Sequence, residues 1–560
     1  MGPHQVSFAP SGRSTIVADG TTIFRAAELA GEPLGGECGG RGACGRCLVR
    51  VLQGAVPEYR VLRHEDGQAE VLGCLTPVHG PLVVHPLVEV QLPQLISRET
   101  DTGLAPLAAW APWPLAFDPI VTRVRDGDLG VAVDIGTTTL RLLIVRLGDG
   151  VIAGEAGAYN PQIPRGADVI TRIVAAERGA LPELAASIRS AVGTLLDTAA
   201  EGAGLDPNRV RAYVVAGNLT MIHLLLAADP SGIRRVPSTP GALAFAPAPA
   251  ADLGWPGTDG AAVHTLPAAG GWVGGDIVAG AVRAGFSRDT TGLGLYVDLG
   301  TNGEILCGGA DFALTCACSA GPAFEGGGIR CGMRADRGAI DGARVDAEKG
   351  TVELSTIGGS RPRGLCGSGL IALTDELFRA GWVDRVGRFT ARLPEHLRAA
   401  GRWGAALALT PDGKVALWER DIGSLIRSKA AVFAGIRTLT GSLGADAPPI
   451  ERVVVSGNFG RFLNLPAAQG IGLLPTLAPG RFGYVANGAL EGAALALLSR
   501  EFGAEVAEYL RRITYVDLAD LPGYMDEFVG ASFLPHTSPE MLELGPGPAY
   551  RRAGFHHNAT

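Results

Sequence analysis

Two stretches of the sequence end a run rich in β-branched residues with an acid, a glycine and hydroxyl or amide side chains. The first, residues 131–139, contains Asp134, and the second, residues 295–304, contains Asp298. A buried strand that ends in this way delivers a carboxylate beside a tight turn that can hold phosphate. A lone copy is more often only a strand-end turn, but two copies in one chain predict a nucleotide site.

Each residue type in these turns has a use in binding a magnesium nucleotide. Mg2+ prefers oxygen ligands, so we expect Asp134 near the metal. Hydrolysis needs an in-line water and stabilised charge, and we expect Asp298 or Glu304 to orient that water. Glycines let the backbone approach phosphate, and hydroxyl and amide groups donate to its oxygens. The residues expected at the phosphates are Gly136, Thr137, Thr138, Gly300, Thr301 and Asn302.

A second strand-to-turn motif is also duplicated, at residues 210–218 and 450–460, and each copy ends in Gly-Asn. The four motifs alternate along the chain, which indicates two similar α/β halves. This pattern resembles the acetate kinase, sugar kinase, Hsp70 and actin (ASKHA) ATPases, which bind nucleotide between two lobes. The resemblance implies that Gly457, Asn458 and Gly460 lie near adenosine, and that Gly217 and Asn218 are their structural echo.

Four cysteines near the N-terminus have the spacing of an iron–sulfur site. Three lie on one loop as C-x5-C-x2-C, and 26 residues separate the third from the fourth. Four thiolates can surround two irons, and the glycines between them allow the backbone to wrap and direct N–H groups at sulfur. Zinc or reactive thiols are the alternatives, but zinc usually takes two C-x2-C pairs. The unit resembles a plant- or vertebrate-type [2Fe–2S] ferredoxin of β-grasp fold. Its expected ligands are Cys38, Cys44, Cys47 and Cys74.

Other chemistry-bearing residues carry weaker signals. A second metal cluster from Cys316, Cys318, Cys331 and Cys366 is conceivable, but the surrounding small residues favour core packing. Asp276, in a Gly-Gly-Asp sequence, is a candidate catalytic acid, and His223 is expected to be a packed helix residue. The glycine-rich loop 321–332 has no role that its sequence pattern predicts.

Composition limits the classes of function. Hydrophobic content of 47% with 19% charged residues indicates a folded protein. A net charge of −8 gives no electrostatic footprint for nucleic acid, and no G-K-[ST] phosphate loop occurs. No apolar run suits a signal peptide or a membrane span, so a cytoplasmic protein is expected. Nine cysteines, an odd number, favour ligands and free thiols over disulfides.

Pattern changes along the chain predict its domain organisation. Apolar residues at helical spacing predict helices over 22–30 and 184–200 and a helical run that reaches Ala380. Prolines interrupt residues 93–128, as in a connector. The predicted units are a [2Fe–2S] ferredoxin domain at 1–92, a linker at 93–128, a first ATPase half at 129–290, a second at 291–535 and a disordered tail at 536–560.

The combination of a ferredoxin, a proline-broken connector and a duplicated ATPase resembles the reductive activators of corrinoid proteins. The resemblance covers about residues 1–535, and the loop at 321–329 also resembles that family. One branch of the family carries its clusters near the C-terminus, whereas residues 536–560 here contain no cysteine. The resemblance implies ATP-dependent reduction of Co(II) to Co(I) in a corrinoid protein of a methyltransferase system. It also implies a [2Fe–2S] cluster, ATP and Mg2+ as cofactors, an upstream reductase, and a homodimer.

The expected redox potentials explain why a ferredoxin and an ATPase would occur in the same chain. Plant-type [2Fe–2S] centres lie near about −400 mV, and the family implies a lower potential for the protein-bound Co(II)/Co(I) couple. Each 59 mV uphill costs about tenfold in equilibrium for one electron, so ATP is needed to shift it. The alternatives are an ATP-driven donor to a dehydratase, a nucleotide-gated redox sensor and a small-molecule kinase. Dehydratase activators lack a ferredoxin domain, and the fusion argues against a kinase.

Overall fold

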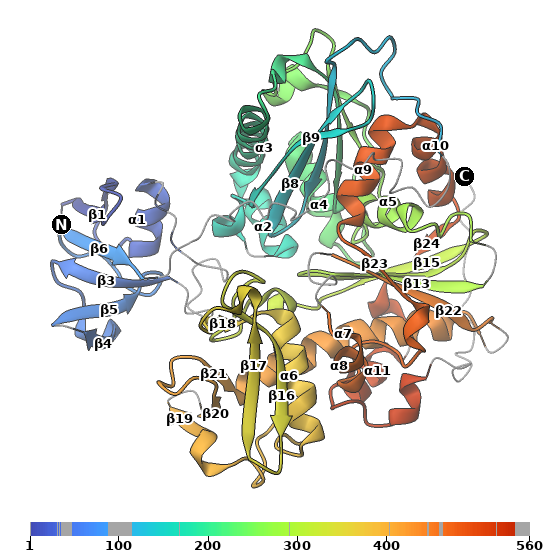
Figure 1. Ribbon diagram of the computed structural model, residues 1–560. Coiled ribbons are helices and arrows are strands. Elements are labelled where there is room, and N and C mark those ends of the chain that lie inside the picture. The colour runs from blue at the N-terminus through green and yellow to red at the C-terminus, as the bar shows by residue number, and fades with distance from the viewer. Residues whose placement is uncertain are drawn as a thin grey trace.

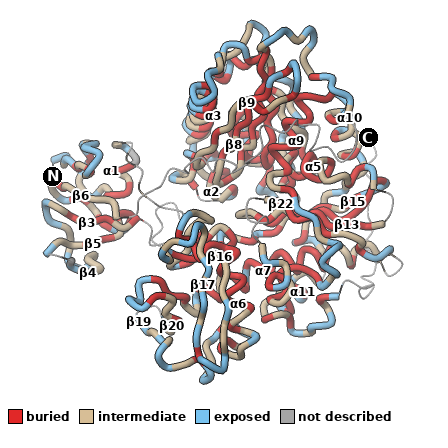
Figure 2. The backbone as a smooth tube through the Cα atoms, in the orientation of Figure 1, coloured by how far each residue is buried: buried red, intermediate tan, exposed pale blue. Residues whose placement is uncertain are grey.

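The computed structural model arranges the chain in five β-sheets with helices around them (Figure 1). It describes residues 2–30, 32, 34, 47–65, 67–87, 115–166, 168–289, 292–401, 404–444, 447–457, 463–521 and 523–543. Three sheets have six strands and two have three. Buried residues follow the strands and covering helices of each six-stranded sheet (Figure 2).

The N-terminal unit is a mixed sheet of order β2-β1-β6-β3-β5-β4 with one helix packed on it. Helix α1 (Ile23–Ala30) buries Ile23, Ala26 and Ala27, which lie on one face at helical spacing, against Val49 and Val84 of the sheet. This is the β-grasp arrangement predicted from the sequence. The strands are β1 (His4–Phe8), β2 (Ser14–Val17), β3 (Leu48–Gln53), β4 (Val61–Glu65), β5 (Gln68–Leu72) and β6 (Leu82–Pro86).

The first ATPase half is a sheet of order β11-β12-β10-β7-β8-β9. Its central strand β7 is buried along most of its length, as expected for a strand with both faces covered. Helix α3 (Leu181–Ala203) packs on one face, and the predicted helix over 184–200 is therefore confirmed. The strands are β7 (Leu129–Ile135), β8 (Thr139–Arg146), β9 (Ile152–Tyr159), β10 (Val210–Gly217), β11 (Ala248–Pro249) and β12 (Ala262–Thr265).

The second half repeats this arrangement in the order β23-β22-β13-β14-β15-β24. In the first half, β10 runs parallel to the acid-bearing strand β7, and β7 pairs antiparallel with β8. In the second half, β22 runs parallel to the acid-bearing strand β13, and β13 pairs antiparallel with β14. The duplicated fold is therefore confirmed. Helix α7 (Glu419–Ser442) covers one face. The strands are β13 (Leu293–Leu299), β14 (Gly303–Gly308), β15 (Ala313–Cys318), β22 (Ile450–Ser456), β23 (Phe482–Val485) and β24 (Ile513–Tyr515).

The two halves share a core built from α5 (Gly275–Arg283), α9 (Gly488–Leu498) and α10 (Arg500–Leu510). Figure 1 shows α9 and α10, from the C-terminal part of the chain, beside α5 at the first half. Gly492 of α9 has no room for a side chain, because a Cβ would lie 2.7 Å from the Cβ of Ala279. This close helix packing joins the halves behind the acid-ending strands.

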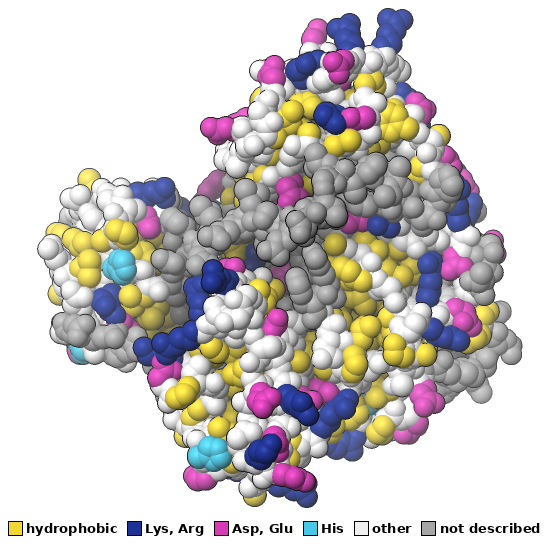
Figure 3. Space-filling view, in the orientation of Figure 1, with side chains coloured by type: hydrophobic (Ala, Val, Ile, Leu, Met, Phe, Trp, Pro, Cys, Tyr) yellow, Lys and Arg dark blue, Asp and Glu magenta, His cyan; other side chains and the backbone are white. Residues whose placement is uncertain are grey.

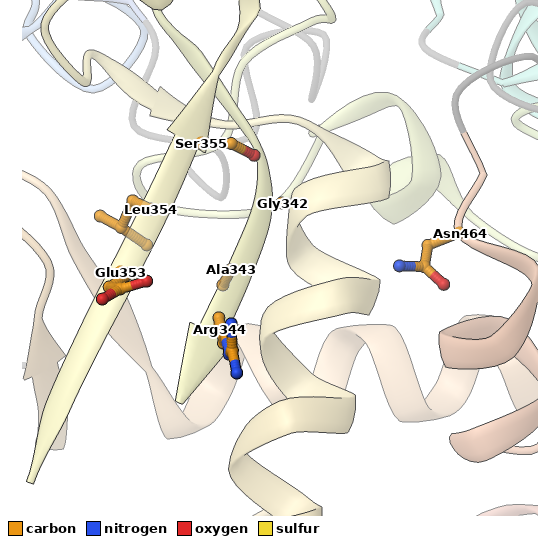
Figure 4. Close-up of a pocket in the computed structure, with 7 residues that line it drawn as sticks. All are labelled: Gly342, Ala343, Arg344, Glu353, Leu354, Ser355 and Asn464. Atoms are coloured by element: carbon orange, nitrogen blue, oxygen red, sulfur yellow. The ribbon is translucent and has the colours of Figure 1, made fainter. Parts of the chain in front are cut away.

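A smaller lobe extends from the second half. It contains the hairpin β16 (Ala339–Asp346) and β17 (Thr351–Thr356), the short strand β18 (Gly364–Leu365) and α6 (Gly367–Arg379). Beside it lies the sheet of β19 (Arg398–Gly401), β20 (Gly404–Ala408) and β21 (Ala416–Trp418). A pocket of about 340 Å3 lies between the hairpin and Asn464 (Figure 4). None of the residues predicted to bind phosphate is among its lining residues.

The C-terminal segment corrects one prediction. Disorder was expected from residue 536, but residues 536–543 are packed, with His536 and Leu542 buried. The buried ammonium of Lys429 on α7 donates to the carbonyls of Phe533 and Pro535, at 2.6 Å each. The carbonyl of Leu542 accepts from the N–H of Thr476 at 2.8 Å. These long-range contacts hold a segment whose local sequence gives no helix or strand pattern. Residues 544–560 lie outside the described part of the chain.

The surface carries both signs of charge. On the face drawn in Figure 3, Lys and Arg alternate with Asp and Glu over both halves and the small lobe. In the described ranges, no helix combines the length and the hydropathy that a membrane span requires.

Candidate functional site

The two predicted phosphate turns meet between the halves. Thr138, after β7, and Thr301, after β13, share a hydrogen bond of 2.8 Å between their Oγ1 atoms. Thr301 also donates from Oγ1 to Oε2 of Glu325 at 3.1 Å. Because a hydroxyl has one hydrogen to donate, Thr138 is the donor to Thr301. The sequence motifs thus converge as predicted, and the hydroxyls form a chain that ends on a carboxylate.

Glycine at position 136 is required by the shape of the first turn. The N–H of Gly136 donates to the carbonyl of Thr139 at 2.9 Å, closing the turn. A Cβ at this position would lie 2.8 Å from that same oxygen. Because the backbone folds onto itself here, a larger residue would force the turn open.

Four carboxylates gather behind the turns. Asp134 ends β7, Asp298 ends β13, Glu304 is the cross-strand partner of Asp298, and Asp276 lies in the first turn of α5. Burial, with the charge of Asp298, raises the pKa of Asp134 to about 6 against the opposing hydrogen bond from Asn487. Burial and the charges of Asp134 and Asp298 raise the pKa of Asp276 to about 8.

The pKa values of the other two acids, Asp298 and Glu304, are also raised. Burial raises the pKa of Asp298, opposed by a hydrogen bond from Ser456 and assisted by the charge of Glu325. Burial, followed by the charges of Asp276 and Asp298, raises the pKa of Glu304 well above its ordinary range. These acids therefore repel one another, and the positive charge of Arg141 offsets the raised pKa of Asp134 only as the smallest of its causes.

This charge pattern suits a divalent cation that arrives with its nucleotide. Among the described residues, no three His, Cys, Asp or Glu side chains form a ready metal cage. Mg2+ usually keeps several waters and binds through one or two carboxylates and substrate phosphates. The acids therefore fit a hydrated Mg2+ bound to phosphate, and they do not form a dedicated protein cage.

Asn487, which the sequence motifs do not mark, orients Asp134. Its Oδ1 caps α9 by accepting from the N–H of Leu490 at 2.9 Å. Its Nδ2 donates to Oδ2 of Asp134, also at 2.9 Å. The residue that begins α9 thus fixes the acid at the end of β7.

Asn160 and Arg172 support the first turn from behind, and the sequence motifs mark neither residue. Asn160 donates from Nδ2 to the carbonyl of Gly136 at 2.8 Å and from its N–H to that of Thr138 at 2.9 Å. The fully buried Arg172 donates from Nη2 to the carbonyl of Thr137 at 2.5 Å. Burial lowers the pKa of Arg172 to about 9, so this guanidinium remains charged near neutral pH.

Asn218 was expected only as the structural counterpart of Asn458, but it contacts the first phosphate turn directly. Its Nδ2 donates to Oγ1 of Thr137 at 3.0 Å, and its Oδ1 caps helix α4 (Leu219–Leu226). In the second half, Gly457 has a left-handed φ of 99°, and a Cβ there would lie 3.0 Å from the carbonyl of Leu299. Asn458 and Gly460, predicted near adenosine, lie outside the described residues.

Two of the four predicted cluster ligands are described and lie together. The Sγ atoms of Cys47 and Cys74 are 3.2 Å apart in a buried setting, without a disulfide. The N–H of Cys74 donates to Sγ of Cys47 at 3.4 Å, an interaction that stabilises a thiolate. Paired thiols that are close but not bonded fit two ligands of a metal centre. Cys38 and Cys44 lie outside the described residues.

Comparison with solved structures agrees with this pairing of a ferredoxin and a duplicated ATPase. A structure described as a reductive activator for corrinoid, iron-sulfur protein is 33% identical, with a TM-score of 0.69, over 96% of this chain and 99% of that one. The chain belongs to the family of reductive activators of corrinoid proteins. Family descriptions assign its parts as a 2Fe-2S iron-sulfur cluster binding domain at 7–79, a RACo middle region at 129–289 and a C-terminal RACo ASKHA domain at 292–544.

Two curated relatives of this reductive activator were found. The corrinoid activation enzyme RamQ of Eubacterium limosum is 28% identical over 89% of this chain and 94% of its own length. The [Co(II) methylated amine-specific corrinoid protein] reductase of Methanosarcina barkeri is 25% identical over 39% of this chain and 42% of its own. The first similarity therefore spans all three domains.

Four of the five remaining cysteines of the activator, Cys307, Cys316, Cys318 and Cys366, are buried core residues, and Cys331 is partly buried. Cys318 donates from Sγ to the carbonyl of Gly303 at 3.1 Å, and Cys366 donates to that of Ile340 at 3.1 Å. Burial raises the pKa of Cys318 far above its usual range, so its thiol stays neutral. His223 is buried in α4, with Nδ1 2.9 Å from the carbonyl of Leu219, as expected for a packed helix residue.

Proposed function

We propose that this reductive activator uses ATP to drive reduction of an inactive Co(II) corrinoid protein to Co(I), restoring its methyltransferase activity. The observation that carries the proposal is the contact between Thr138 and Thr301, which joins two homologous phosphate turns in front of four clustered acids whose pKa values are raised. The same chain carries a ferredoxin domain, and both curated relatives are named for corrinoid proteins. An enzyme of this design has an electron donor and a source of free energy in one polypeptide.

The cluster site is proposed from four cysteines. Cys38, Cys44, Cys47 and Cys74 would hold a [2Fe–2S] cluster, and the buried Cys47–Cys74 pair fits two of its ligands. When bound, such a cluster supplies one electron at low potential. Residue packing around the pair excludes water from two sulfurs, because both side chains are at least nine-tenths buried.

Distinct roles follow for the acids. Asp134, which accepts a hydrogen bond from Asn487, would bind hydrated Mg2+. Asp298 or Glu304 would orient the attacking water. Thr137, Thr138, Thr301 and Asn302 would donate to phosphate oxygens, with Gly136 and Gly300 allowing close approach. Gly457, Asn458 and Gly460 would contact adenosine.

ATP can shift an unfavourable electron transfer only if nucleotide state changes the affinity for one cobalt state over the other. In this structure the Oγ1 atoms of Thr138 and Thr301 are only 2.8 Å apart and are joined by a hydrogen bond. A phosphate that binds both turns must separate these hydroxyls, and the halves around the shared α5–α9 core must adjust. We propose that this adjustment alters binding of the Co(II) and Co(I) proteins.

An anaerobic assay tests the proposal. The reconstituted activator, a Co(II) corrinoid protein and a low-potential reductant are mixed, and the Co(I) absorption band is followed with and without ATP. We expect Co(I) only with ATP, and expect Asp298→Asn to lose ATP hydrolysis and Co(I) formation while retaining its cluster spectrum. Co(I) at the wild-type rate without ATP, or with a stable, hydrolysis-dead variant, would overturn the ATP requirement.

Further partners are also proposals. An upstream reductase would supply electrons to the cluster, the activator would act as a homodimer in the cytoplasm, and Mg2+ would accompany ATP. An ATP-driven donor to another metalloenzyme is the second candidate, because the ATPase part alone fits it equally well. A cluster bound by residues of the ferredoxin domain, shown by loss of iron in Cys74→Ser, would argue against a dehydratase activator of the type that holds its cluster between subunits.

A further inference from the structure

The glycine-rich segment at residues 321–334, here called the strap, has a rigid backbone. Gly326 has a left-handed φ of 74°, and a Cβ there would collide with the backbone of Met333. A Cβ on Gly332 would collide with the backbone of Gly326 and its neighbours. Because the backbone folds closely onto itself at Gly326 and Gly332, these two positions require glycine.

The strap is anchored within the second half. The N–H of Met333 donates to the carbonyl of Leu365 at 2.8 Å, and the N–H of Leu365 donates to that of Cys331 at 2.7 Å. The N–H of Arg330 donates to Oδ1 of Asp421 on α7 at 3.1 Å. These bonds tie the strap to β18 and to the start of α7.

One end of the strap contacts the second phosphate turn, and the other end contacts β9 next to a residue that holds the first turn. At its first end, Glu325 accepts the hydrogen bond from Thr301 of the second turn. At its last end, the guanidinium of Arg334 lies 3.7 Å from the ring centroid of Tyr159, the last residue of β9 in the first half. The next residue, Asn160, holds the carbonyls of Gly136 and Thr138 in the first turn. The strap therefore bridges the two halves beside the Thr138–Thr301 contact.

We propose that Arg334 and Tyr159 are positioning residues, whose contact makes the strap move the first phosphate turn together with the second when nucleotide binds. A phosphate entering between Thr138 and Thr301 breaks their hydrogen bond and displaces Glu325 through Thr301. The rigid strap carries that displacement to Arg334, and the stacked Tyr159 passes it to Asn160 and the first turn. This inference rests on the proposed binding of ATP between the turns, and it adds the element that couples them.

The chain offers a matched pair of variants at this contact. A guanidinium is attracted to the face of an aromatic ring and not to a hydroxyl, so Tyr159→Phe keeps the interaction and Tyr159→Leu removes it. Arg334→Gln removes the positive charge that contacts the Tyr159 ring. It therefore tests the same contact if Tyr159→Leu fails to fold. Tyr159 and Arg334 are both partly exposed, which favours folded variants.

The test is hydrogen–deuterium exchange of the full-length protein with and without Mg2+ and a non-hydrolysable ATP analogue, alongside steady-state ATP hydrolysis. In the wild type and in Tyr159→Phe, we expect the analogue to change exchange both at residues 157–160 and at residues 323–334. In Tyr159→Leu and Arg334→Gln, we expect the change at 323–334 to remain and the change at 157–160 to be lost. The KM for ATP should remain at the wild-type value while kcat falls.

The outcomes separate this inference from the proposed function. No analogue-dependent change anywhere in the wild type would refute nucleotide binding between the turns, and the coupling would fall with it. Binding with a full response at 157–160 in Tyr159→Leu and Arg334→Gln would leave ATP binding intact and overturn the coupling role. A loss of response in Tyr159→Phe equal to that in Tyr159→Leu would also overturn it, because the ring face would then not be the part that matters.

Discussion

Asn487 donates a 2.9 Å hydrogen bond to the carboxylate of Asp134, a residue 353 positions earlier in the chain. Asn487 begins α9, and α9 packs against α5 in the core shared by the two halves. The orientation of the acid proposed to bind Mg2+ is therefore set by the helix that joins the halves. Any relative movement of the halves would change the orientation of Asp134 and the positions of the phosphate turns together.

Asn487→Ala should reduce ATP hydrolysis far more than it reduces stability. Loss of the cap costs about 1 kcal/mol. Loss of the Asp134 contact should lower kcat/KM by about tenfold or more, since about 1.4 kcal/mol of transition-state stabilisation is a factor of ten. The control is Asn464→Ala, which removes a comparable cap from helix α8 (Leu465–Gly470) without touching the acids. Equal kcat/KM values in the two variants would contradict the role given to Asn487.

Asp276→Asn should stabilise the nucleotide-free protein, increasingly so as pH rises. The folded pKa of Asp276 is raised to about 8, so between about pH 4 and pH 8 the folded state holds a proton that the unfolded state has lost. Wild-type stability therefore falls with rising pH across this window, and the variant lacks that contribution. Tm in the presence of a chelator, measured from pH 5 to pH 8, checks the trend. Asp252→Asn, at an exposed acid, should show the wild-type pH dependence.

Lys429→Met should release the C-terminal segment from α7. The substitution leaves the partly buried carbonyls of Phe533 and Pro535 without their donor, at a cost of about 1 kcal/mol for each hydrogen bond lost. Burial lowers the pKa of Lys429 to about 7, so wild-type stability should rise as pH increases above 7, and the variant should not show this rise. Hydrogen exchange of residues 533–543 and Tm from pH 6 to pH 9 measure both effects. Unchanged hydrogen exchange at residues 533–543 would argue against the proposal that Lys429 anchors this segment to α7.

Cys74→Ser should lose most of the bound iron, whereas Cys318→Ser should keep it. Cys74 shares a buried sulfur pair with Cys47, while Cys318 only donates to the carbonyl of Gly303, a role that a serine hydroxyl can fill. Iron and acid-labile sulfide are measured after reconstitution, together with the visible spectrum. Comparable iron loss in both variants would refute the assignment of the cluster to the N-terminal cysteines alone.

The sequence by itself determined the elements whose signals are local. A run of apolar residues ending in an acid and glycine predicted β7 and β13, helical spacing predicted α3, and cysteine spacing predicted the cluster loop. Each of these signals depends on residues within one strand, helix or turn, where side-chain period and turn chemistry are legible. Duplication of two motifs was enough to predict two similar halves, which the paired sheets confirm.

Only the tertiary structure decided which groups surround the phosphate turns. Asn160, Arg172 and Asn487 carry no motif, because neither the type of a residue nor its immediate neighbours show which distant group its side chain reaches. Likewise the packed residues 536–543 depend on Lys429 of a distant helix and not on their own pattern. Hydrogen bonds to a turn require a donor at a particular place in space, and chain packing over hundreds of residues fixes that place.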